Sequence, residues 1–263
     1  MDWIEQARES AHQAGVTREE NLPFLLPADT PTERAILLVH GFSASPREMR
    51  PLGQYLQQQG FCVLGVRLPG HGTSPADLAS RRAEEWLETV ELGYQQLARK
   101  YPQVSALGLS TGALLVLKLA LRRSLASLIL LSPFLKLKHP LTPYVALLHR
   151  FIPYAKKLID PAEQPFYYDK RPLKGIAQIN RLRRELRSRL GEIQVPTLVL
   201  AASGDQTIAP GSAAELFRRL GSPAKRFHLY GADTPHVLIG EKSPARQDAF
   251  QRCRDFLAGS DNC

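Results

Sequence analysis

The stretch Ala106-Leu-Gly-Leu-Ser-Thr-Gly-Ala113 decides how the middle of this sequence can fold. An apolar run ends at Ser110, with Gly108 two positions before the serine and Gly112 two positions after it. The run before the serine is typical of a buried strand, and residues 112–123 are typical of a buried helix. A chain that reverses from strand to helix at once brings backbone against both flanking positions, which favours glycine there. The pattern therefore predicts a strand, a sharp turn at Ser110 and a helix.

Strand-like and helix-like stretches alternate on both sides of this turn. Apolar runs typical of strands occupy 35–42, 61–68, 125–134, 196–203 and 224–231. Helical patterns occupy 46–59, 83–99, 211–221 and 244–257, and a short helix and a loop are expected within 1–34. Apolar strands that alternate with helices form a parallel sheet that is covered on both faces. We therefore expect the α/β class, with a mostly parallel central sheet.

Residues 135–190 interrupt this alternation. They hold six prolines, no run typical of a strand, and 13 Lys and Arg against 4 Asp and Glu, a surplus that equals the whole net charge of +9. Apolar residues at helical spacing run from Ile179 to Leu190. We expect a small helical cap at 135–190, inserted after the sixth strand over the carboxyl edge of the sheet. Residues 1–134 and 191–263 would form the core.

The composition excludes several classes of protein. A chain of 263 residues that is 44% hydrophobic can bury one sizeable core. Three cysteines without a CxxC pair indicate neither a disulfide framework nor a zinc site, and we expect no metal and no cofactor. The first residues lack the pattern of a secretory signal, and no apolar run is long enough to span a bilayer. A cytoplasmic protein without stable membrane insertion is expected.

Ser110 is a candidate nucleophile because its surroundings fit the pattern G-x-S-x-G. A hydroxyl becomes a useful nucleophile only when a base takes its proton. On a strand–turn–helix site of this kind, an acid and then a histidine follow the serine along the chain. His236, in a loop just past the last strand-like run, is the predicted base. His228 lies inside that run and is expected to be structural.

The predicted acid is Asp205, which directly follows the strand-like run 196–203. Its carboxylate would hold the tautomer of the histidine and stabilise the imidazolium. Asp233 is the alternative, because it lies three residues before His236. Two other carboxylates in the expected cap are weaker candidates, namely Asp160 and Asp169.

Backbone N–H groups should stabilise the oxyanion that forms in acyl transfer. One donor would be Thr111, the residue after the nucleophile, and the other would be Phe42, in the loop after the first apolar run. The Pro/Gly-rich stretch 67–72 would shape the opposite rim, where His71 is expected to be structural.

Five motifs together resemble the α/β-hydrolase superfamily, namely LLVHGF, RLPGHG, GLSTG, SGDQTIAP and TPHVL. The resemblance is strongest to bacterial carboxylesterases with a small cap and to monoacylglycerol lipases, and it extends from about residue 35 to 257. It implies ester hydrolysis through an acyl-enzyme, with Ser110, Asp205 and His236 as the triad. Two positions depart from the family pattern: Pro235 stands where a glycine commonly precedes the histidine, and Thr111 stands where Leu, Met or Gln is commoner.

These observations favour a serine carboxylesterase for small to medium, single-chain acyl esters, monoacylglycerol included. Cap residues such as Phe134, Leu135, Tyr144 and Phe151 would supply an apolar acyl pocket. A thioesterase or a peptidase of the same fold is the alternative, because substrate choice resides in the pocket and not in the fold. A non-catalytic ligand receptor with a hydrolase fold is the third interpretation.

The expected partner is a small-molecule ester. Nucleic acid is not expected, because the basic segment lacks the interleaved aromatic residues of a stacking platform. Weak contact of the basic cap with an anionic membrane surface stays open as an alternative to a merely solvated surface.

Overall fold

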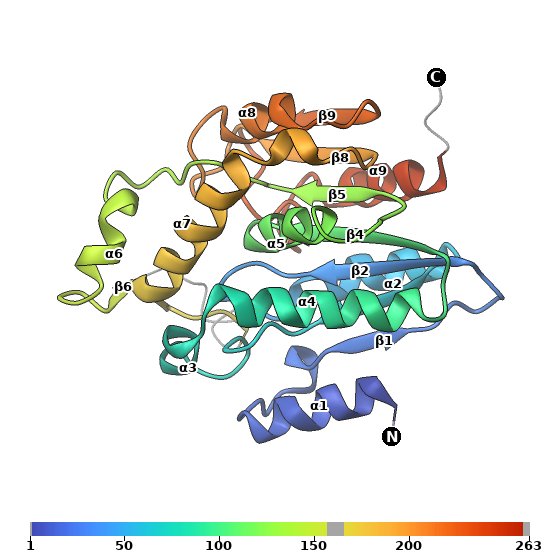
Figure 1. The fold of residues 1–263 in the computed structure, drawn as a ribbon, viewed down its shortest axis with the longest axis horizontal. Coiled ribbons are helices and arrows are strands. Elements are labelled where there is room, and N and C mark those ends of the chain that lie inside the picture. The colour runs from blue at the N-terminus through green and yellow to red at the C-terminus, as the bar shows by residue number, and fades with distance from the viewer. Residues whose placement is uncertain (1, 157–165, 260–263) are drawn as a thin grey trace.

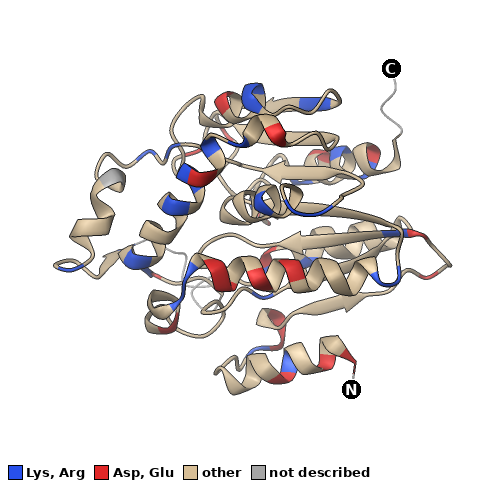
Figure 2. Cartoon of the chain, in the orientation of Figure 1, with Lys and Arg blue, Asp and Glu red and all other residues tan. Residues whose placement is uncertain are grey.

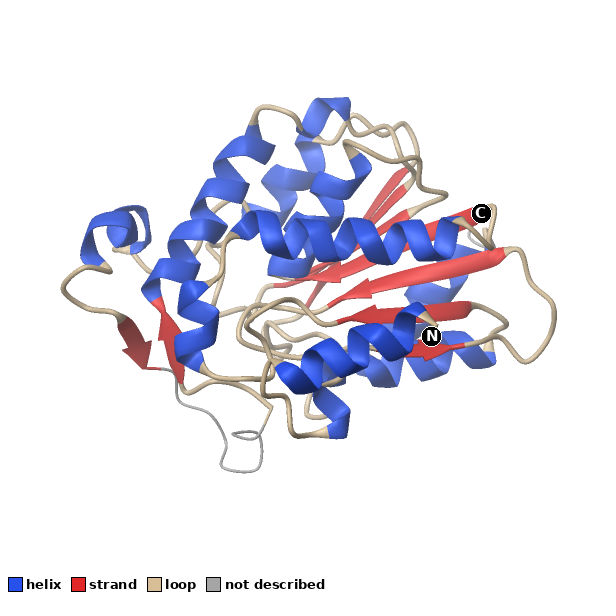
Figure 3. Ribbon diagram, turned by 60° about the horizontal axis from the view of Figure 1, so that its bottom comes forward, coloured by secondary structure: helices blue, strands red, loops and turns tan. Residues whose placement is uncertain are grey.

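A seven-stranded sheet forms the centre of the protein, and helices cover both of its faces (Figures 1 and 3). The computed structural model describes residues 2–156 and 166–259. The strands of this sheet are β1 (Phe24–Leu26), β2 (Arg34–Val39), β3 (Cys62–Val66), β4 (Gln103–Leu109), β5 (Leu128–Leu131), β8 (Thr197–Ala202) and β9 (Lys225–Tyr230). They lie in the order β1-β3-β2-β4-β5-β8-β9, and only the β1–β3 pair is antiparallel. The expected α/β class with a mostly parallel sheet is confirmed.

The helices pack in two layers. One face is covered by α4 (Ala83–Ala98), α5 (Thr111–Ala120), α7 (Leu173–Arg187) and α8 (Ser212–Arg219). The other face is covered by α2 (Arg50–Gln58) and α9 (Arg246–Ala258). Outside these layers lie α1 (Trp3–Gln13), α3 (Pro75–Ser80), α6 (Val145–Leu148) and the 3-10 turns η1 (Glu19–Asn21), η2 (Pro46–Glu48), η3 (Thr142–Tyr144) and η4 (Leu190–Glu192). Within the described ranges, no helix is both long and apolar enough to cross a membrane.

Burial on both faces explains why the inner strands, such as β2, are apolar at nearly every position. Successive side chains of a strand point to opposite faces of the sheet. In β2, Ile36 and Leu38 enter the cluster that includes α2 and α9, whereas Leu37 and Val39 enter the cluster that includes Trp86 of α4. A central parallel strand therefore reads as a continuous hydrophobic run and not as an alternation.

The edge strand β1 was not expected from the sequence. It pairs antiparallel with β3, with Phe24 opposite Gly65, and its three residues are too few to give a periodic pattern. A Cβ atom on Gly65 would come within 2.3 Å of the Phe24 ring, so the missing side chain lets the ring lie flat on the sheet. This contact is long-range in sequence, and local propensity does not reveal it.

The described residues of the segment 135–190 lie at the end of the sheet to which the arrows of β2 and β5 point (Figure 1). It follows β5, the fifth strand of the chain and not the sixth as predicted. The expectation that it lacks strands was wrong, because β6 (Tyr154–Lys156) pairs antiparallel with β7 (Lys170–Pro172). Each of these strands has three residues, and their pairing depends on a contact that no local pattern signals.

Helix α7 joins this segment to the core. Its buried Leu182 and Leu186 belong to the same apolar cluster as α5, and Lys118 of α5 contacts Glu185 at 2.8 Å. Arg181 forms an ion pair with Glu84 of α4, so part of the basic surplus faces acidic groups of the core (Figure 2). Because α7 shares the main hydrophobic cluster, the division into a core and a cap at 135–190 stays a prediction.

The turn between β4 and α5 has the geometry that the sequence predicted. Ser110 has φ 55° and ψ −111°, a strained conformation for a residue with a side chain. A Cβ on Gly108 would lie 2.3 Å from the carbonyl of Gly112, and a Cβ on Gly112 would lie 2.2 Å from the carbonyl oxygen of Val39. Both glycines are therefore required by backbone packing, as the sequence suggested.

We expect Gly112→Ala to lower the free energy of unfolding by roughly 3 kcal/mol or more, because the added methyl group overlaps backbone that cannot rotate away. Urea denaturation measures this change. Gly191→Ala is the matched control, since a Cβ there meets no atom within 4 Å and φ is not positive. Equal losses in the two variants would show that close packing is not what requires glycine at position 112.

Candidate active site

Ser110, His236 and Asp205 form a continuous chain of hydrogen bonds at the carboxyl ends of the strands. The Nε2 atom of His236 lies 2.8 Å from the Ser110 hydroxyl, and its Nδ1 atom lies 2.5 Å from Oδ2 of Asp205. A carboxylate only accepts, so Nδ1–H donates to Asp205 and Nε2 is left to accept the hydroxyl proton. Three residues that lie 31 and 126 positions apart in sequence are thus brought together as predicted.

Asp205 is held as a buried carboxylate. Its side chain is 2% exposed, and Oδ1 accepts the backbone N–H groups of Thr207 at 2.7 Å and Ile208 at 3.1 Å. Burial by itself raises the pKa of Asp205, but the hydrogen bond from His236 and the two backbone donors outweigh it and lower the pKa. The group opposite His236 therefore stays ionised at neutral pH.

The alternative acids lie elsewhere. Asp233 is exposed, and its carboxylate accepts a hydrogen bond from the neighbouring Thr234 hydroxyl at 3.3 Å, with no contact to His236. Asp169 is exposed, and Asp160 lies outside the described residues. The turn of Asp205 instead packs directly on the histidine loop, because a Cβ on Gly204 would lie 2.2 Å from the carbonyl oxygen of Ala232.

Ser132 fixes the histidine loop, and the sequence did not reveal this role. Its hydroxyl donates to the backbone carbonyl of His236 at 2.6 Å, and its own φ is 47°. Its N–H donates to the carbonyl of Leu200 at 2.8 Å, which ties the end of β5 to β8. The available signal is its position: Ser132 directly follows a buried strand, as Ser110 does.

The loop after β2 carries the other predicted backbone donor. No acceptor among the described residues takes the N–H of Phe42 or of Thr111, so both are free to bind an oxyanion. The neighbouring Gly41 N–H donates to Oε2 of Glu48 at 2.8 Å. Glu48 thereby fixes the His40–Gly41 peptide, which directly precedes the peptide that carries the Phe42 N–H. The sequence did not reveal this contact because it joins a loop to η2 across seven positions.

Buried His40 holds the same loop from below. Its Nε2 accepts the N–H of Leu68 at 3.2 Å, so Nδ1 carries the proton and donates to the carbonyl of Gly41 at 2.9 Å. Burial lowers the pKa of His40 to about 4 and holds the pKa of His71 well below its usual range. The His71 ring packs edge-on against Phe42 with centroids 5.9 Å apart, which agrees with the structural role expected for it.

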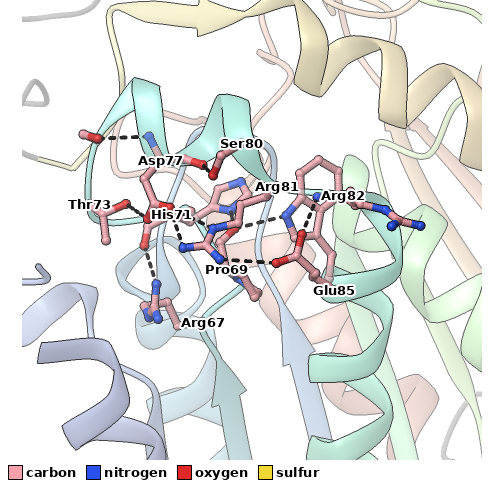
Figure 4. Close-up of polar contacts among 12 residues, drawn as sticks. Arg67, Pro69, His71, Thr73, Asp77, Ser80, Arg81, Arg82 and Glu85 are labelled. Carbon is pink, nitrogen blue, oxygen red and sulfur yellow. Dashed lines mark hydrogen bonds and ion pairs between the residues drawn. The ribbon is translucent and has the colours of Figure 1, made fainter. Parts of the chain in front are cut away.

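The loop between β3 and α3 forms a braced rim beside this pair of histidines (Figure 4). Arg67 donates to the carbonyl of His71 at 3.1 Å. The Arg81 guanidinium contacts the carboxylates of Asp77 at 2.6 Å and Glu85 at 3.2 Å. The loop itself is tied to α3 by the Thr73 hydroxyl, which donates to Asp77 at 2.7 Å, and to α4 by the Trp86 indole, which donates to the carbonyl of Pro69 at 3.0 Å. The rim is therefore a fixed wall.

A cavity of about 380 Å³ opens beside Ser110 and His236. Its apolar lining comes from Phe42, Leu109, Phe134, Leu137, Ile176, Ile179, Pro235 and Val237, and its polar lining includes Glu48, Tyr167 and Arg171. Among the described residues, no cluster of three or more His, Cys, Asp or Glu side chains could hold a metal ion.

The expectation for the acyl pocket was correct only in part. Phe134 lines the cavity, whereas Leu135 is buried outside it. Tyr144 is 62% exposed and Phe151 is 79% exposed, so neither lines the pocket. Tyr144 lies in the short turn η3, and Phe151 lies three residues beyond α6. The apolar wall comes instead from α7, through Ile176 and Ile179.

Comparison with known proteins places this arrangement in a family. The chain matches the family described as serine aminopeptidase, S33, over residues 30–167 and 160–243, and it belongs to that family. It is 28% identical over 224 residues to a thermostable monoacylglycerol lipase of Bacillus sp. (strain H-257), covering 79% of this chain and 88% of the relative. It is 26% identical over 226 residues to a carboxylesterase of Bacillus subtilis (strain 168), covering 83% and 92%.

Solved structures share the fold. A structure reported for the metagenome-derived lipolytic enzymes LipS and LipT superposes with a TM-score of 0.82 at 20% identity, over 92% of this chain and 98% of that one. The monoacylglycerol lipase of Paleococcus ferrophilus superposes with a TM-score of 0.77 at 20% identity, over 90% and 98%. The fold is thus that of the α/β-hydrolases, as the motifs implied.

The buried, neutral His40 predicts an acid-sensitive fold. Its folded pKa of about 4 lies below the 6.5 of a free histidine, so the unfolded state binds more protons and stability falls as pH decreases from 6.5 to 4. We expect the free energy of unfolding to drop by about 2 kcal/mol between pH 7 and pH 5 from His40 alone, with His71 acting in the same direction. Urea denaturation at the two pH values measures the drop.

The exposed His139 provides the control, because it lies outside the buried pair of His40 and His71. His139→Gln should show the same pH dependence as the unmodified protein. Equal stability of the unmodified protein at pH 7 and pH 5 would contradict a neutral His40 in the folded state.

Proposed function

We propose that this protein is a serine hydrolase that cleaves carboxylic esters of small to medium, single-chain acyl groups through an acyl-enzyme. The observation that carries the proposal is the hydrogen-bonded chain from Asp205 through His236 to Ser110. The strained backbone at Ser110 costs free energy of folding, and strain of this kind is concentrated at active sites. It therefore supports a catalytic use of the Ser110 hydroxyl. The names of the two relatives, a monoacylglycerol lipase and a carboxylesterase, support the same substrate class.

The geometry suggests the steps of the reaction. Ser110 Oγ attacks the ester carbonyl carbon while His236 Nε2 takes its proton, and ionised Asp205 stabilises the imidazolium that forms. The tetrahedral intermediate collapses, and the leaving alkoxide takes the proton from His236. A water molecule then gives a proton to His236 and attacks the carbonyl carbon of the acyl-enzyme. The serine oxygen leaves and takes that proton back from His236, which releases the carboxylic acid and restores Ser110.

The backbone groups of Phe42 and Thr111 are the proposed oxyanion donors. Both N–H groups lack acceptors among the described residues and flank the cavity, and Thr111 begins α5, so the partial positive charge of the helix end adds to its effect. His40 would hold the Gly41–Phe42 peptide through the Gly41 carbonyl, and Glu48 would hold the preceding His40–Gly41 peptide, before substrate arrives. Such preorganised donors typically contribute about 3 kcal/mol each to the stability of the transition state.

The competing interpretations differ in what the same site would accept. The family description names an aminopeptidase, and a thioesterase would use the same three residues. The cavity favours esters with an acyl chain, because most of its lining is apolar and its volume of about 380 Å³ holds a short hydrocarbon. A non-catalytic receptor would have no need of the strained Ser110, and labelling by a fluorophosphonate distinguishes it from an enzyme.

The triad assignment predicts a steep and selective loss of activity. Ser110→Ala and Asp205→Asn should each lower kcat for p-nitrophenyl butyrate by about 10⁴-fold, because one removes the nucleophile and the other leaves the histidine without its orienting anion. Release of p-nitrophenol measures the change.

Two matched controls test the assignment. Ser105→Ala removes another buried serine, from β4, the strand that precedes Ser110, and Asp233→Asn removes the alternative acid. Both should keep activity within about twofold, since neither side chain contacts His236. Retained turnover in the Ser110 variant, or a larger loss in the Asp233 variant than in the Asp205 variant, would overturn the assignment.

We also propose a cytoplasmic enzyme whose cap makes weak contact with anionic lipid surfaces. Five apolar side chains of the segment 141–152 are exposed, namely Leu141, Tyr144, Leu147, Phe151 and Ile152. A basic hollow of about 260 Å³ is lined by Lys136, Lys138 and Arg184, which also belong to residues 135–190. Apolar side chains beside cations are the combination that binds the surface of an anionic bilayer.

We expect Leu147→Asp with Phe151→Asp to abolish cosedimentation with vesicles that contain phosphatidylserine, because the substitutions remove apolar area and add negative charge. Leu92→Asp, which changes an exposed apolar residue of α4 away from the cap, should leave cosedimentation unchanged. Equal binding of both variants, or no binding by the unmodified protein, would contradict the contact.

A further inference from the structure

Glu48, Tyr167 and Arg171 are polar side chains of the cavity that neither attack the substrate nor transfer a proton in the proposed hydrolysis. Glu48 accepts the Gly41 N–H through Oε2 at 2.8 Å and the Tyr167 hydroxyl through Oε1 at 3.1 Å. The third, Arg171, lies in β7 and lines the same cavity as Ser110. A cavity for a plain hydrocarbon ester needs no guanidinium, so the presence of Arg171 calls for a ligand of different chemistry.

The guanidinium of Arg171 is without a partner in the described part of the chain. No hydrogen bond or ion pair joins it to another described residue, and its Nε is buried without an acceptor. Burial lowers the pKa of Arg171, and the negative charge of Glu48 opposes that effect. An arginine stays protonated through such a shift. The cavity therefore contains a cation whose N–H groups have no acceptor among the described residues.

Glu48 does not satisfy this cation by contact. No hydrogen bond or ion pair joins its carboxylate to Arg171, and its two oxygens accept instead from the Gly41 N–H and the Tyr167 hydroxyl. A partly desolvated charge without a hydrogen-bonded partner is unfavourable, and an incoming anion relieves that cost. The planar fork of a guanidinium matches a carboxylate or a phosphate, each of which can accept two parallel hydrogen bonds.

We propose that Arg171 binds a carboxylate or phosphate of the substrate, so that the enzyme prefers esters that carry a second, anionic group. Phe134, Ile176 and Val237 form the apolar part of the cavity, which takes the hydrocarbon chain. The preferred substrate is therefore an acidic ester, with a hydrocarbon portion and an oxyanion on the same molecule. This inference rests on the proposed ester hydrolysis and adds a specificity-determining residue to it.

The test compares anionic and neutral esters of matched size. One arm places the anion on the acyl side, with mono-p-nitrophenyl adipate against p-nitrophenyl hexanoate. The other arm places it on the alcohol side, with 1-hexanoylglycerol 3-phosphate against 1-hexanoylglycerol. We expect Arg171→Gln to lower the ratio of kcat/KM for the anionic ester over the neutral ester by at least about tenfold in one arm, and that arm identifies the end of the substrate that Arg171 binds. An unchanged ratio in both arms would overturn the proposal.

Lys170→Gln is the matched control, because it removes the same charge from the adjacent, exposed position of β7. Its ratio should stay within about twofold of that of the unmodified protein, because exposed charges are screened by solvent. Arg171→Lys keeps the charge without the fork, and its ratio should lie between those of the unmodified protein and Arg171→Gln. A fall of the ratio in Lys170→Gln as large as in Arg171→Gln would mean that general charge, and not this site, sets the preference.

Thermal denaturation checks that Arg171→Gln is folded. Should it not fold, inhibition of the unmodified protein answers the same question, because free adipate or glycerol 3-phosphate should compete with p-nitrophenyl hexanoate and compete less well at high salt. Absence of inhibition by both anions would then overturn the proposal. A protein that hydrolyses none of the four esters would instead refute the proposed function itself, so the two failures are distinguishable.

Discussion

The contact between Gly112 and the carbonyl oxygen of Val39 is the constraint on which the site depends. It lets α5 begin directly over β2, and this leaves Ser110 with a positive φ at the tip of the turn. The strain at the serine is held because its N–H is fixed to the carbonyl of Leu131 on the neighbouring strand. A larger residue at position 112 would separate the helix from the sheet and release the serine from its position.

The parallel sheet brings the remaining groups to the same edge. The carboxyl ends of β2, β4, β5, β8 and β9 meet there, so loops that are far apart in sequence become neighbours. Asp205 follows β8 and His236 follows β9, and Ser132 at the end of β5 holds the histidine loop by its backbone. Two buried polar groups, His40 and Glu48, then fix the loop after β2. The polar network lies in loops, whereas the strands beneath supply a rigid apolar base.

The elements that the sequence predicted correctly are long or have a strong local signature. The inner strands β2, β3, β5 and β8 are apolar at nearly every position, and glycine at both 108 and 112 indicates the sharp turn at Ser110. The strands that were missed are β1, β6 and β7, each of three residues and each defined by pairing with another segment. The acyl wall was misassigned to Tyr144 and Phe151 for a related reason, since hydrophobic composition does not say which side of a short turn faces the cavity.

The sequence by itself determined the order of the longer strands and helices, the turn at Ser110 and the candidates for base and acid, because these follow from local patterns and chain order. Only the tertiary structure shows that Asp205, and not Asp233, is hydrogen-bonded to His236, since this bond joins loops 31 residues apart. It also revealed Glu48 and Arg171 together in the cavity, although 123 positions separate them. Long-range burial creates such neighbours, and it leaves no periodic trace in the chain.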